Sequence, residues 1–265
     1  MKLSHIFKSL TKFEKIWLAI FSFAIVATTC IFSYMYTDYT NIWSILLNWV
    51  FSPFSALTGV MCVVLAAKGH IATWWIGLIN SATYGLIAWL SGYYGDWMLN
   101  WFYFIPTQII IYFVWKKNIT NEIVTMKKLN VKQMLITLFS FAILTYFTSL
   151  FLLKVDNWFT IALRRNTTIY GYLEQLTGSN TIGPILDSLS NNLQIFAQIF
   201  MIMMFAEQWV FWSLTNVITI TMWILVIVLD KNSYAYAIPT LIMWISYMVN
   251  SFYGAYNWYK KSKQN

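Results

Sequence analysis

The amino-acid sequence predicts an all-α polytopic membrane protein, and three observations support this class. Of its 265 residues, 59% are hydrophobic and only 10% are charged, whereas about 25% of residues are charged in soluble globular domains. Apolar runs close to the length of about 20 residues that a spanning helix needs recur along the chain. The basic residues gather in alternate connectors between these runs, as the positive-inside rule expects.

Eight runs are close to the spanning length, and we expect each of them to form one transmembrane helix. The runs cover residues 16–36, 44–67, 71–90, 97–115, 133–153, 183–205, 209–229 and 234–258. The connectors at residues 68–70 and 206–208 are so short that they predict antiparallel hairpins. Residues 154–182 form the only long connector, and residues 158–163 within it are expected to lie along the membrane interface.

The distribution of charge predicts the orientation. If the N-terminus is cytoplasmic, only four of the 17 basic residues fall on the outer side. These four are Lys154, Arg164, Arg165 and Lys231. Eight spans also return the basic C-terminus to the cytoplasm. The net charge of +8 therefore indicates membrane topology and contact with lipid rather than a nucleic-acid partner.

An internal repeat divides the chain. When Asn80 is superposed on Asn216, the second to fourth runs align with the sixth to eighth, the fifth run is a linker, and the first lies outside the repeat. Two parallel three-helix repeats joined by one helix are an architecture of transporters. The predicted segments are a cytoplasmic N-terminus with a peripheral first helix (1–42), the first repeat (43–116), a cytoplasmic loop with the linker helix (117–153), an extracytoplasmic loop (154–182), and the second repeat with the basic C-terminus (183–265).

Polar residues inside the apolar runs are candidates for a binding site, because an amide or carboxyl in hydrocarbon is costly unless it has a partner or lines a cavity. Asp187, Asn191, Gln194 and Gln198 are spaced so that they share one helix face. Further candidates in the other runs are Asn80, Tyr84, Asn100, Gln108, Trp212, Asn216, Trp244 and Tyr247. Together they predict a cavity that is rich in amides, hydroxyls and indoles and nearly free of formal charge.

This chemistry suits a neutral or weakly cationic, nucleoside-like ligand. Amides and hydroxyls bind sugar hydroxyls and carboxamides, and aromatic faces hold flat rings, including cationic ones. A phosphate does not fit, because no arginine or lysine lies within a predicted run. A proton- or ion-coupled carrier is poorly supported, since Asp187 is the only ionisable candidate in a run.

Structural interpretations compete with these functional ones. An intramembrane amide often serves only as a hydrogen-bonding link between helices. Tryptophans near the ends of runs are expected to anchor the protein at the membrane interface; they are Trp17, Trp43, Trp115 and Trp258. Cys30 and Cys62 are expected to be buried packing residues. Glu207 either caps the helix that follows it or gates the inner mouth.

Motifs of enzymes are absent from the sequence. It has no nucleophile elbow, zinc-ligand cluster, nucleotide-binding loop or pair of catalytic carboxylates. We therefore expect no catalytic residue, no cofactor and no metal.

Three sequence elements stand out together: Gly77-Leu-Ile-Asn80, Asp187-Ser188, and Glu207-Gln-Trp-x-x-Trp212-x-x-x-Asn216. They resemble the PnuC family of bacterial vitamin transporters for nicotinamide riboside, and the similarity covers roughly residues 53–258. The resemblance implies two fused SWEET-type triple-helix bundles in the bacterial inner membrane and assembly as a homotrimer. It also implies facilitated diffusion of unphosphorylated nicotinamide riboside by alternating access, trapping by a cytosolic kinase, and substrate contacts from Asn80, Trp212 and Asn216.

Other functions remain open from the sequence. The basic residues expected before Glu207 are replaced by residues 203–206, and Asn100 stands where a glutamine is expected. A related transporter of thiamine, riboflavin or a deoxynucleoside is therefore the first alternative. The second is a membrane scaffold that transports nothing and whose amides only connect helices.

Overall fold

The computed structural model describes residues 3–120, 123–124, 126–162 and 169–262. Its α-helices are α1 (Leu3–Ser9), α2 (Lys12–Tyr36), α3 (Ile42–Leu46), α4 (Ser52–Lys68), α5 (Thr73–Ser91), α6 (Tyr94–Met98), α7 (Ile105–Lys116), α8 (Val131–Ala162), α9 (Ile169–Thr177), α10 (Ile182–Ile202), α11 (Gln208–Leu229) and α12 (Tyr234–Ser262). Two π-helical turns, η1 (Leu47–Phe51) and η2 (Leu99–Phe104), a 3₁₀ turn, η3 (Lys231–Ser233), and the short antiparallel strands β1 (Ile119–Thr120) and β2 (Ile123–Val124) complete the described elements.

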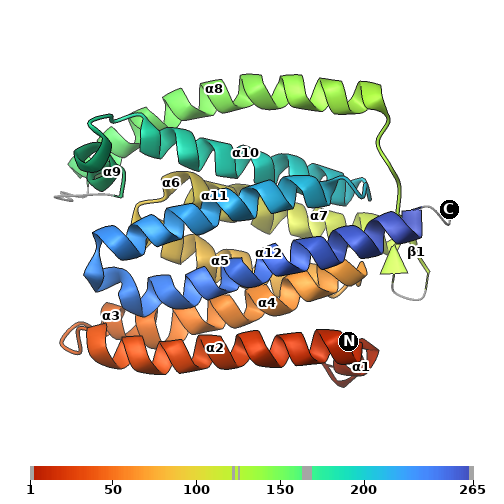
Figure 1. Ribbon diagram of the computed structural model, residues 1–265, viewed down its shortest axis with the longest axis horizontal. Coiled ribbons are helices and arrows are strands. Elements are labelled where there is room, and N and C mark those ends of the chain that lie inside the picture. The colour runs from red at the N-terminus through yellow and green to blue at the C-terminus, as the bar shows by residue number, and fades with distance from the viewer. Residues whose placement is uncertain (1–2, 121–122, 125, 163–168, 263–265) are drawn as a thin grey trace.

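The long helices lie side by side in one bundle (Figure 1). Helix α2 packs on α4 and α12 at one flank, and α8 packs mainly on α10 at the opposite flank. Among the described residues, five stretches are helical, long and apolar enough to cross a membrane, namely Lys12–Tyr36, Ile42–Lys68, Tyr94–Lys116, Val131–Val155 and Gln208–Leu229. The prediction of an all-α, multi-pass membrane protein is therefore confirmed at this level.

The other three predicted runs are also helical. Helices α5, α10 and α12 cover most of residues 71–90, 183–205 and 234–258 and lie against the apolar helices. Many of the buried polar side chains are on α10, including Asp187, Asn191 and Gln194. These three helices therefore carry much of the polar chemistry inside the bundle.

Two long helices widen into a π-helical turn just before a proline. Turn η1 precedes Pro53 of α4, and η2 precedes Pro106 of α7. Proline lacks the N–H of a regular helix and its ring collides with the carbonyl four residues earlier, so the wider turn relieves this clash. Such π-turns are frequent at functional sites, and η2 contains Asn100, one of the predicted site residues.

Helices α4, α7, α10 and α12 all end at the same end of the bundle, which we call the terminus end (Figure 1). There, two tryptophans form hydrogen bonds between the two halves of the chain. The Trp115 indole donates a 3.1 Å hydrogen bond to the Met201 carbonyl, and the Trp258 indole donates a 3.2 Å bond to the Ala66 carbonyl. Both rings are fully buried. The prediction that they anchor the protein at the membrane interface is wrong, because their N–H groups are used inside the core. Trp17 is also buried, whereas Trp43 is exposed.

A short chain segment crosses the terminus end and binds the turn between α10 and α11. Lys127 exchanges backbone hydrogen bonds with Met204 and Ala206, at 2.8 and 2.9 Å. The Leu129 N–H donates to the Glu207 carboxylate at 3.1 Å, and Glu207 makes no capping bond in its own helix. Glu207 therefore holds the segment leading into α8.

The predicted loop at residues 154–182 is largely helical. Helix α8 continues to Ala162, and α9 fills much of the remainder. No glycine or proline interrupts residues 154–162, so nothing in the sequence stops the helix after its membrane-spanning part. The predicted interfacial segment 158–163 is thus the end of α8 as far as Ala162, and Leu163, Arg164 and Arg165 lie outside the described residues.

Candidate functional site

A cavity of about 110 Å³ lies in the middle of the bundle. Helices α4, α5 and α7 and turn η2 line it from the first half of the chain, and α10, α11 and α12 line it from the second. All but two of the predicted site residues are on its wall: Asn80, Tyr84, Asn100, Gln108, Gln194, Gln198, Trp212, Asn216, Trp244 and Tyr247. None of the lining residues that the structure describes is an aspartate, glutamate, lysine, arginine or histidine.

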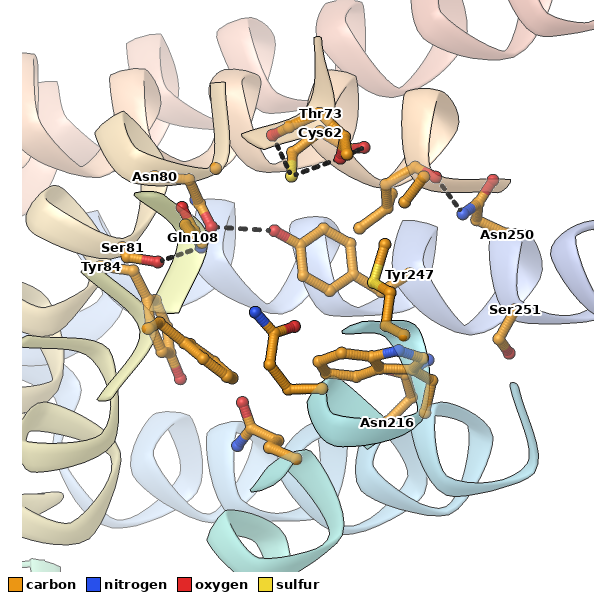
Figure 2. Close-up of a pocket in the computed structure, with 18 of the residues that line it drawn as sticks. Cys62, Thr73, Asn80, Ser81, Tyr84, Gln108, Asn216, Tyr247, Asn250 and Ser251 are labelled. Atoms are coloured by element: carbon orange, nitrogen blue, oxygen red, sulfur yellow. Dashed lines mark hydrogen bonds between the residues drawn. The ribbon is translucent and has the colours of Figure 1, made fainter. Parts of the chain in front are cut away.

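The amides of the first half are held by neighbouring side chains (Figure 2). Asn80 donates a 2.8 Å hydrogen bond to the Ser55 carbonyl, and its oxygen accepts a 3.4 Å bond from the Tyr247 hydroxyl. Gln108 donates to the Ser81 hydroxyl at 3.0 Å, while the Gln108 Oε1 has no partner among the described residues. Gln108 thus keeps one acceptor for a ligand.

The amides of the second half have free hydrogen-bonding atoms. In the described part of the chain, neither the Asn216 Oδ1 nor the Gln198 Nε2 has a partner, although both side chains are buried. Buried polar groups in native proteins are normally hydrogen-bonded. With Gln108 and Asn250, the lining amides leave three acceptors and one donor unpaired among the described residues. The indole N–H groups of Trp74, Trp209 and Trp244 are further unpaired donors in the lining, and such a set can meet a carboxamide and hydroxyls.

Aromatic rings form another part of the wall. Trp244 lies with its ring centroid 5.0 Å from that of Tyr247 and 5.7 Å from that of Tyr84. The ring centroids of Trp212 and Phe104, which both line the cavity, are 6.4 Å apart. These faces can hold a flat ring, and a cationic ring gains additional attraction from their π-electrons.

A carboxylate that the sequence pattern does not single out lies directly behind this wall. Asp96 is fully buried and accepts a 2.7 Å hydrogen bond from the Tyr84 hydroxyl and a 3.1 Å bond from the Gln194 amide. Its backbone carbonyl accepts a 2.8 Å bond from Asn100. Asp96 was missed because it stands one residue before the predicted run at 97–115.

Asp187 and Asn191 do not line the cavity, so their predicted position on its wall is wrong. The Asp187 carboxylate accepts hydrogen bonds from the Gly95 N–H at 2.9 Å, from the Asn191 amide at 2.6 Å, and from the Tyr170 hydroxyl. The predicted stripe on α10 covers three helical turns, about 16 Å at 1.5 Å per residue. Of these four residues, only Gln194 and Gln198, at the C-terminal end of the stripe, line the cavity.

The cysteines differ from each other. Cys62 lines the cavity with its sulfur 3.4 Å from the Thr73 hydroxyl, and Cys30 is exposed on α2. The prediction of a buried packing role is therefore wrong for Cys30, because α2 lies at the flank of the bundle. Both thiols are free.

Apolar helices that enclose an uncharged cavity with unpaired amide atoms define a membrane transporter for a small polar molecule. The family profile described as "Nicotinamide mononucleotide transporter" matches residues 50–260, so the chain belongs to this family. Family and relatives are transporters, which confirms that the chain is not an enzyme.

Individual relatives agree with this assignment. The chain is 29% identical to a nicotinamide riboside transporter PnuC of Neisseria mucosa over 98% of its own length and 86% of the relative's. It is 30% identical to the PnuC of Haemophilus influenzae, over 95% and 92%. A crystal structure of the vitamin B3 transporter PnuC superposes with a TM-score of 0.72 at 26% identity and covers 100% of this chain and 99% of that one. The resemblance to the PnuC family is confirmed.

Proposed function

We propose that this protein transports nicotinamide riboside into the cytoplasm by facilitated diffusion. The observation that carries this proposal is the uncharged cavity wall with the unpaired atoms of Gln108, Gln198 and Asn216. The unpaired amides suit the carboxamide and ribose of this nucleoside, and the aromatic faces suit its pyridinium ring. The curated relatives are named as nicotinamide riboside transporters.

The cavity favours the riboside over the mononucleotide named in the family description. A phosphate monoester carries a charge of about −1.5 to −2 near neutral pH. Burying that charge without a lysine or arginine partner is very costly, and none lies among the described lining residues. A cytosolic kinase that phosphorylates the nucleoside would therefore trap it, since the product no longer fits the site.

The size of the cavity supports alternating access. A cavity of about 150 Å³ is enough to bind benzene, so a cavity of 110 Å³ is somewhat smaller than a single flat ring requires. A ribose needs further room, and the lining helices must move apart to admit it. The two halves are joined at the terminus end by Trp115 and Trp258 and at the opposite end by hydrogen bonds of Asp96 and Asp187. To open the cavity at either end of the bundle, the protein must break the hydrogen bonds between the halves at that end.

The proposal includes eight spans in two parallel three-helix repeats around a linker helix. Two features support the repeat. The Trp115 and Trp258 bonds are reciprocal, since each links the last helix of one half to the end of the first helix of the other. Helices α4 and α10 also end alike, at Gly69 (φ 75°) and Met204 (φ 64°), each followed by a backbone bond that reaches five residues back.

The position in the membrane is part of the same proposal. Both termini lie at one end of the bundle (Figure 1), which fits a bacterial inner-membrane protein with both termini in the cytoplasm. Exposed apolar side chains cover much of α8, among them Leu135, Phe139 and Phe147, and lipid would cover them. From the resemblance to the PnuC family, we also propose that the protein assembles as a homotrimer.

Equilibrium binding to the purified protein tests the choice of substrate. We expect calorimetry to show saturable binding of nicotinamide riboside and at least about 10-fold weaker binding of the mononucleotide, because the phosphate would be buried unpaired. Thiamine, riboflavin and a deoxynucleoside serve as competitors. Tighter binding of one of them would transfer the assignment to that vitamin, and no binding of any by a folded protein would favour the scaffold.

A further inference from the structure

Two fully buried carboxyl groups, those of Asp96 and Asp187, lie outside the cavity lining, in the part of the bundle opposite the terminus end. Both are arranged only as hydrogen-bond acceptors: Asp96 accepts through its two oxygens from Tyr84 and Gln194, and Asp187 accepts from Gly95, Asn191 and Tyr170. No basic residue in the described part of the chain forms an ion pair with either of them. The ion pair that the described residues do form joins Lys68 to Glu14, away from both carboxyl groups. Among the described residues, these two carboxyl groups therefore have no basic partner.

Asp96 is separated from the cavity by a single layer of side chains. The Tyr84 hydroxyl and the Gln194 amide, which donate to its two oxygens, both belong to the cavity wall. Asp96 itself is fully buried, so a charge on it is less screened at the ligand than a charge in water would be. The wall also has aromatic faces and unpaired amide atoms, such as the Asn216 Oδ1, and these features indicate that the cavity binds a ligand.

We propose that Asp96 selects ligands with a permanently cationic ring, by supplying the counter-charge that the cavity wall lacks. This inference rests on the proposed function and deepens it, because it names the residue that makes the site prefer a nucleoside whose ring nitrogen is quaternary. Asp96 acts as a positioning and charge-selecting residue through Tyr84 and Gln194 rather than by touching the ligand. The same charge disfavours an anionic analogue, which adds to the exclusion of phosphorylated forms.

The discriminating ligand is the 1,4-dihydro form of nicotinamide riboside. Addition of a hydride to ring C4 removes the positive charge and leaves the carboxamide, the ribose and nearly the whole shape. The wild-type protein is expected to bind the cationic form at least about 10-fold more tightly than the dihydro form. Asp96→Asn keeps the size of the side chain and removes its charge, so it should weaken binding of the cation roughly 30-fold. That is the factor that Coulomb attraction produces between unit charges about 8 Å apart at an effective dielectric constant near 20.

The ratio of the two affinities separates charge selection from simple structural damage. Asp96→Asn is expected to change binding of the dihydro form by less than about threefold, so the preference for the cation collapses. Asp96→Glu and Tyr84→Phe keep the carboxylate, and the preference should survive in both even where the affinities fall together. An Asp96→Asn variant that keeps the wild-type ratio would overturn the proposal.

A measurement on the unaltered protein covers the case in which Asp96→Asn does not fold. Equal affinity of the wild type for the cationic and dihydro forms would refute the role of Asp96 while leaving nicotinamide riboside as the substrate. Failure of the wild type to bind either form would instead refute the proposed function. The two failures are therefore distinguishable.

Discussion

Replacing Asn216 by alanine is expected to weaken binding of nicotinamide riboside strongly while leaving the thermal stability of the protein unchanged. The Asn216 Oδ1 is buried and has no partner among the described residues, so the substitution breaks no protein hydrogen bond through this atom. A ligand group that donates to it would lose that bond, which costs about 1–3 kcal/mol, or roughly 5- to 150-fold in affinity. Calorimetry and melting of the same preparations measure both effects.

Asn192→Ala is the matched control. Asn192 is equally buried, but it lies outside the cavity lining and donates to the hydroxyls of Thr148 and Thr145 at 2.7 and 3.2 Å, joining α10 to α8. We expect this variant to melt at a lower temperature and to keep its affinity for the ligand. If Asn216→Ala behaves in the same way, Asn216 only connects helices and the site is wrongly assigned.

Gly59→Ala is expected to reduce uptake at least about 10-fold, because Gly59 provides the space in which two lining side chains meet. An added Cβ would lie 2.8 Å from the Asn80 amide nitrogen, 2.6 Å from the Met243 sulfur and closer still to the Tyr247 hydroxyl. Overpacking of this kind typically costs about 1–3 kcal/mol of stability. It would also displace Asn80 and Tyr247, which line the cavity. Uptake per folded protein, with the melting temperature, measures both consequences.

The double variant Gly59→Ala with Tyr247→Phe tests the cause. Removing the hydroxyl oxygen relieves the closest contact of the new methyl group, so the melting temperature should recover part of its loss. A Gly59→Ala protein with normal uptake and normal stability would contradict this account, because it would show that the side chains around Gly59 can accommodate a methyl group.

Much of the fold and of the cavity wall could be predicted because both depend on local patterns. Uninterrupted apolar runs already indicated where the long helices lie, since a polar backbone in a membrane must be hydrogen-bonded within its own helix. Amides such as Gln194, Gln198 and Asn216 stood out because hydrocarbon tolerates them only with a partner or at a cavity. Their places on the cavity wall followed from helical periodicity.

The features that could not be predicted depend on contacts between distant segments. Trp115 and Trp258 have the sequence context of interfacial tryptophans, and only the packing of the two halves reveals that each bonds to a carbonyl of the other half. Asp187 and Asn191 share a helix face with lining residues, but periodicity does not tell how far along that face a cavity extends. Asp96 lies at the edge of an apolar run, where a charged residue ordinarily reaches water.

Counterflow in proteoliposomes tests the central claim most directly. Vesicles loaded with unlabelled nicotinamide riboside are diluted into a trace of labelled nucleoside, without an ion gradient. We predict transient accumulation of label that saturates with concentration. The mononucleotide should not inhibit it at equal concentration, and the Asn216→Ala protein should show much less of it. Absence of exchange by a wild-type protein that melts cooperatively in the same lipid would contradict the claim that this cavity carries nicotinamide riboside.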